Sequence, residues 1–225
     1  LLVGRLEAAE RTLEGLDLAA LPATSRAGYW LVAAGIAMRR IRTRPARTAL
    51  DHAARAAHEM QIPALRREVD RAFRALDAPA ARLVARDGQR LLPLDEVEAL
   101  LASDALVIDA CRTVVRARAT VIPLGSRPVM FTLARALAEA WPADASREVL
   151  LARAFRARHI DESHRARLRV EIGRLRKALA PLAGLHATRH GFRLAPRDST
   201  AAAVLAPPVE GDHAGVLALL PEGEA

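Results

Sequence analysis

The sequence predicts a mainly α-helical protein with small antiparallel β elements. Apolar side chains recur at helical spacing through residues 1–78 and again from about residue 126 to residue 180, and this periodicity is typical of amphipathic helices. Short β-branched segments with short connectors lie between these stretches and favour antiparallel strands. We therefore expect helices over residues 1–78, a mixed domain over residues 79–195, and a linker leading into a further helical element over residues 196–225.

The composition is that of a globular protein. A chain of 225 residues, with 52% apolar and 27% charged side chains, can bury a core without disulfides. Its one cysteine, Cys111, excludes a disulfide-built scaffold and is expected to be a small apolar side chain rather than a nucleophile. The longest strongly apolar run, residues 29–38, is about half of a membrane span, and no signal-peptide pattern is visible. We therefore expect a cytoplasmic protein with no membrane partner.

Residues 1–78 are expected to form four helices. Stripes of apolar residues define these helices over about residues 2–16, 25–42, 45–60 and 63–76. Pro45 and Pro63 are placed at helix starts, where the missing N–H costs little. This region resembles tetratricopeptide-type helical hairpins in size and alanine pattern, but the full Trp–Leu–Gly–Tyr signature is absent, and a plain helical bundle explains the pattern equally well. Either arrangement would serve self-association as a homodimer or binding of a protein partner.

Short strands are expected next. Asp87-Gly88 favours a tight type I′ turn, which would join a hairpin of residues 82–86 and 89–92. The other elements expected here are one helix and the three strands of a meander, over residues 94–102, 105–109, 113–116 and 120–124.

The helical period then returns, and three further helices are expected. Ser and Asp side chains cap helix N-termini, and the candidate caps are Ser126, Ser146 and either Asp161 or Ser163. The third helix extends to about Ala180, and residues 185–195 form a hairpin after it. A small sheet, three helices and a C-terminal hairpin, in this order, are the elements of a winged helix-turn-helix.

Two segments of this region resemble the OmpR/PhoB-type DNA-binding domain of bacterial transcription regulators. Residues 168–179, Leu-Arg-Val-Glu-Ile-Gly-Arg-Leu-Arg-Lys-Ala-Leu, match the pattern of the family's recognition helix. Residues 187–194, Ala-Thr-Arg-His-Gly-Phe-Arg-Leu, are similar to the family's wing, with Phe192 in place of the usual tyrosine and a shorter turn. The resemblance covers residues from about 105 to 195. It implies a helix in the major groove of double-stranded DNA, a wing on the adjacent backbone or minor groove, and RNA polymerase as a partner of the loop at residues 158–162.

The residues of the predicted recognition helix separate into two faces. One narrow apolar stripe, which must pack on the rest of the domain, contains Leu168, Ile172, Leu175 and Leu179. The opposite face carries Ala166, Val170, Gly173 and Lys177. Arginines on both sides of this face can reach phosphates or guanine edges, and Val170 can touch a thymine methyl. The residues predicted to contact DNA are Arg165, Arg167, Arg169, Val170, Gly173, Arg174, Arg176, Lys177 and Arg189.

The distribution of charge supports this interpretation. Residues 112–193 hold 17 basic and 6 acidic side chains, and they carry the whole positive excess of a chain with net charge +8. A concentrated positive field favours phosphate backbones through counterion release. A solvated basic face is the alternative explanation. In the same way, Arg189 is either a wing contact to DNA or a plain turn arginine.

No catalytic motif is present, so we expect no enzymatic activity and no cofactor or metal. The sequence lacks a Walker A loop, a Gly-x-Gly-x-x-Gly loop and a Gly-x-Ser-x-Gly elbow, and its seven histidines are scattered. Residues 1–78 do not alternate strands and helices as a receiver domain does, so control by aspartyl phosphorylation is not expected. We expect a transcription regulator. The alternative is a protein-interaction adaptor that works through its helical region and whose winged helix does not bind DNA.

Overall fold

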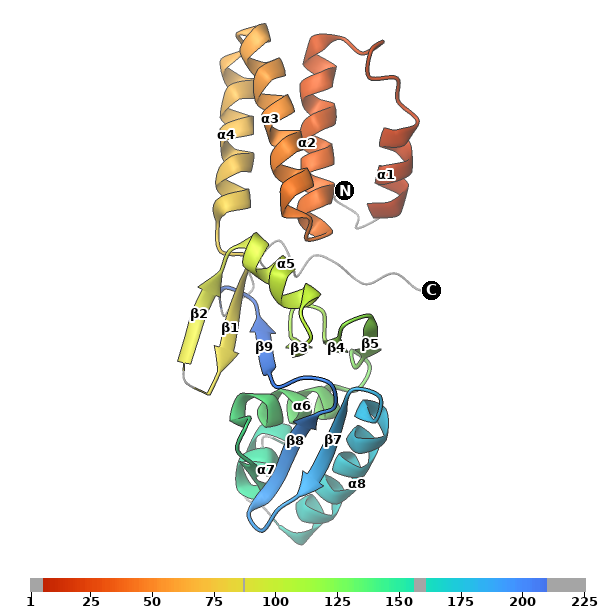
Figure 1. The fold of residues 1–225 in the computed structure, drawn as a ribbon, viewed down its shortest axis with the longest axis vertical. Helices are drawn as coiled ribbons and strands as arrows, with labels where there is room; N and C mark the ends of the chain where they lie inside the picture. Colours follow the sequence, from red (N-terminus) through yellow and green to blue (C-terminus); the bar gives the residue numbers. More distant parts are fainter. Residues whose placement is uncertain (1–5, 87, 156–160, 210–225) are drawn as a thin grey trace. The chain divides into compact units, whose positions relative to one another are not determined.

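The computed structural model describes residues 6–86, 88–155 and 161–209. Helices dominate these residues and two sheets accompany them (Figure 1), so the predicted class of mainly α with small β elements is confirmed. None of the helices among the described residues is both long and apolar enough to cross a membrane. The chain divides into two compact units, and the second one comprises the described residues of 82–91 and 99–207.

The first unit is mainly helical. Its four predicted helices are confirmed as α1 (Leu6–Glu14), α2 (Ala23–Arg39), α3 (Thr43–Met60) and α4 (Pro63–Asp77). Helices α2, α3 and α4 lie side by side (Figure 1). The buried alanines Ala34 and Ala53 allow helices to approach closely. Trp30 of α2 stacks on His52 of α3, with the ring centroids 4.3 Å apart.

A six-stranded sheet is formed by described residues that lie far apart in the sequence. Its strands are β1 (Ala81–Ala85), β2 (Gly88–Leu92), β3 (Leu106–Asp109), β4 (Val114–Ala117), β5 (Thr120–Pro123) and β9 (Ala202–Ala206). The strand order is β2-β1-β9-β3-β4-β5. The β1–β2 hairpin, the helix after it, α5 (Leu94–Ala102), and the antiparallel β3–β4–β5 meander match the prediction. Asp87, in the predicted turn, lies outside the described residues.

Strand β9 lies in the segment that the sequence predicts to be a linker. The prediction for residues 196–225 is wrong at residues 202–206, because this segment is a strand with all of its residues buried. It pairs antiparallel with β1 and parallel with β3, so Val204 is the partner of both Val84 and Ile108. The sheet is therefore not purely antiparallel. Alanine has a low β propensity, so the alanine-rich composition of residues 202–206 does not predict a strand. The further helical element expected after it lies outside the described residues.

Three helices and a three-stranded sheet complete the second unit. The helices are α6 (Pro128–Ala140), α7 (Arg147–Phe155) and α8 (Glu162–Leu179). The strands are β6 (Ala145–Ser146), β7 (Ala183–Ala187) and β8 (Gly191–Pro196), paired in the order β6-β8-β7. The predicted C-terminal hairpin is thus present as β7–β8. Sequence reasoning did not predict the short strand β6, which adds a third strand to the hairpin.

Two of the three predicted helix caps are confirmed. Ser146 Oγ accepts a hydrogen bond from the backbone N–H of Val149 at 3.2 Å. Asp161 Oδ1 accepts one from the backbone N–H of His164 at 2.9 Å. The cap predicted at Ser126 is wrong, since α6 is preceded by Arg127 and has no side-chain cap. Pro at the first helical position fixes the start of α6 instead.

One hydrophobic core joins the helices and the sheets of the second unit. Leu133 of α6, Leu175 of α8, Ile108 of β3 and Val204 of β9 are all fully buried in the same cluster. The orientation of α8 is therefore fixed by packing on α6 and α7.

Candidate nucleic-acid interface

Helix α8 has the two faces that the sequence predicts. The four residues of its apolar stripe, from Leu168 to Leu179, are at most 3% exposed. On the opposite face Val170 is 52% exposed, Ala166 and Lys177 are exposed and Gly173 is half-buried. Because about half of the Val170 side chain is exposed, this face of α8 carries a small apolar surface that is accessible to solvent.

One flank of α8 faces α7 and the β7–β8 hairpin. Here Arg165 and Arg169 line a hollow of about 480 Å³ together with Arg147 at the start of α7 and Phe192 of β8. Arg169 forms an ion pair with Glu162 at 2.7 Å, and Arg165 lies 3.5 Å from the same carboxylate. These arginines are 63% and 67% exposed, so their ion pairs with Glu162 are weak and can be exchanged for others.

Arg147 fixes the hairpin beside this flank. Its guanidinium donates to the backbone carbonyls of Arg189 at 2.8 Å and Thr188 at 3.0 Å, and it lies over the Phe192 ring at 5.5 Å. Thr188 in turn donates to Asp144 at 2.5 Å. These bonds hold the turn of the hairpin at a defined position next to α8. Sequence reasoning missed Arg147, since its role depends on strand β6 bringing the start of α7 to the hairpin.

Gly191 is required where the hairpin meets β6. A Cβ atom at this position would lie 1.8 Å from the backbone oxygen of Ala145, which no side chain can tolerate. Gly173 on α8 is different, because a Cβ atom there would meet no heavy atom within 4 Å. Glycine inside a helix costs about 1 kcal/mol relative to alanine. Packing therefore explains Gly191 and does not explain Gly173.

The other predicted arginines lie apart from this group. Arg167 lies over the ring of Phe155 at 4.9 Å, and Arg174 pairs with Glu171 at 2.8 Å beside a second hollow, of about 440 Å³. Arg176 donates to the backbone carbonyl of Leu185 at 3.0 Å, which ties α8 to β7.

Two predicted cations, Lys177 and Arg189, have no fixed partner among the described residues. Lys177 and Arg189 are exposed, and within the described part of the chain neither side chain forms a hydrogen bond or an ion pair. Of the loop that the family resemblance links to RNA polymerase, residues 158–160 lie outside the described residues.

Three carboxylates near α8 and the hairpin are held in the ionised form. The hydrogen bond from Thr188 lowers the pKa of Asp144. Hydrogen bonds from its own backbone N–H and from Ser146 lower the pKa of Glu148. Backbone and side-chain hydrogen bonds from His164 lower the pKa of Asp161. At neutral pH these groups offset part of the positive charge, so the cationic character rests on the arginines and Lys177.

No metal site or reactive thiol is found in the described residues. No group of three His, Cys, Asp or Glu side chains in residues 6–86, 88–155 and 161–209 could hold a metal ion. Burial and the neighbouring Asp109 carboxylate raise the pKa of the Cys111 thiol to about 12, so the thiol stays protonated at neutral pH and is a poor nucleophile.

No family model, curated protein or solved structure matches this chain. The resemblance to OmpR/PhoB-type domains therefore rests on the residues of α8 and of the β7–β8 hairpin.

Proposed function

We propose that this protein binds double-stranded DNA in a sequence-specific manner and regulates transcription. In this proposal α6, α7, α8 and the β7–β8 hairpin act as a winged helix-turn-helix of the OmpR/PhoB type. Helix α8 lies in the major groove, and the hairpin lies on the adjacent backbone or in the minor groove. The observation that carries the proposal is the outward face of α8, which has small side chains at its centre, arginines on its flank and a braced hairpin beside it.

The shape of α8 suits a major groove. The groove admits an α-helix and exposes a distinct pattern of donors, acceptors and methyl groups for each base pair. Small residues at the centre of the helix let the backbone come close to the base edges. Val170 is placed to touch a thymine methyl, and Arg174 and Lys177 are the candidates for guanine contacts.

The arginines on the flank of α8 that faces the β7–β8 hairpin are placed to bind DNA phosphates. Arg147, Arg165 and Arg169 line one hollow together with a single carboxylate, that of Glu148, and Arg165 and Arg169 pair with Glu162. Guanidinium groups form charge-assisted and often bidentate hydrogen bonds with phosphates, and the exposed ion pairs that they would give up contribute little to stability. Arg189 on the braced turn is placed to contact the backbone or the minor groove next to them.

Gly173 provides a prediction that separates DNA binding from stability. Replacing Gly173 with leucine is expected to leave the protein at least as stable, since leucine has a higher helix propensity than glycine and a Cβ atom at this position meets no heavy atom within 4 Å. Affinity for specific DNA is expected to fall about tenfold or more, because the larger side chain lifts α8 from base contacts worth about 1–3 kcal/mol each. Chemical unfolding and a DNA titration measure the two effects.

Gly173→Ala is the matched control, with a similar gain in stability and nearly unchanged DNA affinity. Full affinity in the leucine variant would show that the outward face of α8 does not approach DNA.

The proposal as a whole is tested by selecting duplexes from a random pool with the full 225-residue chain. We expect one sequence motif to be enriched and to bind about 10³-fold more tightly than random duplex DNA, as is typical of specific DNA-binding proteins. A pool that shows no enriched motif after repeated rounds would contradict sequence-specific binding.

A further inference from the structure

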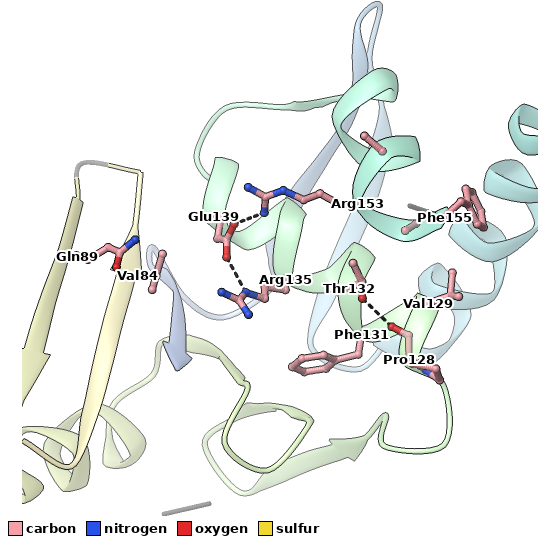
Figure 2. Close-up of a pocket in the computed structure, with 12 residues that line it drawn as sticks. Val84, Gln89, Pro128, Val129, Phe131, Thr132, Arg135, Glu139, Arg153 and Phe155 are labelled. Carbon is pink, nitrogen blue, oxygen red and sulfur yellow. Dashed lines mark hydrogen bonds and ion pairs between the residues drawn. The ribbon is translucent and has the colours of Figure 1, made fainter. Parts of the chain in front are cut away.

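A third hollow, of about 770 Å³, lies beside α6 and shares Pro128 and Val129 with the hollow next to Arg174. It is bounded by α6, by the end of α7 and by the β1–β2 hairpin, all within the second unit (Figure 2). Its apolar wall includes Val84, Val129, Phe131 and Phe155. Its volume falls within the range of about 300–1,000 Å³ that is usual for small-molecule sites.

Three charged side chains converge in this hollow. Arg135 and Glu139 lie one helical turn apart on α6, and Arg135 Nε donates to Glu139 at 2.7 Å. Arg153 of α7 donates to the other oxygen of the same carboxylate. Phe131 precedes Arg135 by a further turn, so the ring, the guanidinium and the carboxylate follow one face of the helix. Figure 2 shows Phe131 and Arg135 on the side of α6 that faces Val84 and Gln89.

The cluster carries one net positive charge. Burial by itself raises the pKa of Glu139, but the hydrogen bonds and charges of Arg153 and Arg135 outweigh burial and lower it below its usual value. The carboxylate is therefore ionised at neutral pH and balances only one of the two arginines. No second carboxylate lines the described walls of this hollow.

Both arginines retain donors for another group. A guanidinium has five N–H donors, and Arg135 and Arg153 each use one of them on Glu139. Their side chains are 36% and 47% exposed, so the remaining donors are accessible from the hollow. A planar carboxylate matches the fork of a guanidinium, and the neighbouring Phe131 ring offers a flat apolar surface.

We propose that this hollow binds a small organic anion in which a carboxylate is attached to a flat aromatic body. The carboxylate pairs with Arg135 and Arg153, and the aromatic body lies against Phe131 and Val84. This proposal does not depend on DNA binding by α8. The residues that line this hollow belong to α6, α7 and the β1–β2 hairpin, and none of them belongs to α8.

The test is calorimetric titration of the 225-residue chain with 2-naphthoate and with 2-naphthamide, which has the same shape without the charge. We expect naphthoate to bind about tenfold more tightly than naphthamide, because the carboxylate forms charge-assisted hydrogen bonds with the guanidinium groups and the neutral amide does not. Arg153→Gln is expected to remove this preference, whereas Arg193→Gln, at an exposed position on β8, is expected to keep it.

The Glu139→Gln variant tests whether the charge of the cluster determines the affinity for naphthoate, rather than the structure that the cluster supports. This variant removes the competing carboxylate and raises the net charge of the cluster, so naphthoate is expected to bind several-fold more tightly. Equal affinity for naphthoate and naphthamide, or no binding of either at millimolar concentration, would overturn the proposal. Tighter binding of the dipeptide N-acetyl-Phe-Asp than of naphthoate would also overturn it and would assign the hollow to an acidic segment of a protein partner.

Discussion

Replacing Asp109 with alanine is expected to lower the free energy of unfolding by about 3–5 kcal/mol, the usual cost of removing one partner from a buried ion pair. Asp109 is fully buried at the end of β3 and is the one charged residue in the buried core of the described residues. Its carboxylate accepts hydrogen bonds from the backbone N–H groups of Cys111 and Arg112, at 2.9 and 3.1 Å, and from the Arg112 guanidinium at 3.2 Å. Alanine would leave a charge and two N–H groups buried without partners.

Asp104→Ala is the matched control for this prediction. Asp104 pairs with Arg118 at 2.7 Å, but both side chains are exposed, so its loss is expected to cost less than about 1 kcal/mol. Asp109→Asn keeps an acceptor for the backbone and should fall between the two. Urea unfolding of the three variants gives the order directly. Equal stabilities of the Asp109 and Asp104 variants would show that β3 does not end in a buried ion pair.

Replacing Leu175 with alanine is expected to destabilise the protein by about 2–5 kcal/mol, because the change leaves a cavity in a closely packed core. Leu175 is fully buried in the C-terminal half of α8, in the cluster that joins α6, α8 and the sheets. The melting temperature and the midpoint of urea unfolding report this loss.

Val170→Ala on the same helix separates the two faces of α8. Val170 is 52% exposed, so its truncation is expected to change stability by less than about 0.5 kcal/mol. If the outward face contacts thymine methyls, the same variant weakens specific DNA binding. An unchanged melting temperature for Leu175→Ala together with a large drop for Val170→Ala would reverse the two faces.

The helices of this protein were predictable because each one carries its own periodic pattern. The apolar stripe of α8, the proline at the start of α4 and the caps at Ser146 and Asp161 are local signals, and local chemistry alone accounts for them. The cap of α6 was predicted wrongly because Ser126 and Pro128 both mark a helix start, and the proline determines it.

The strands that depend on distant partners could not be predicted in the same way. Strand β9 is a short alanine-rich run, and it becomes a strand because β1 and β3 leave a place between them for its backbone. Strand β6 has two residues and exists only through its pairing with β8. Periodicity is a property of one segment, so it carries no information about such pairings.

The candidate interface could also be predicted only where it depends on local sequence, and not where it depends on contacts between distant segments. The sequence identified the outward face of α8, since a helical wheel places those residues together. It could not identify Arg147, which reaches the turn of the hairpin from another helix. The same wheel places Arg167 and Arg174 on one flank and Arg169 on the other, but it could not show that the flank with Arg169 is the one beside the hairpin.

The central claim is tested most directly by measuring the affinity of the chain for its selected duplex as a function of salt concentration. Four cations are placed to contact phosphates, namely Arg147, Arg165, Arg169 and Arg189, and each contact contributes about 0.9 to the slope of log K against log salt. We expect a slope of about −4 for the native chain and about −2 for the Arg165→Ala, Arg169→Ala double variant. Weak affinity with no salt dependence, or the same slope in both proteins, would contradict DNA binding by this face and would favour an adaptor that works through α1–α4.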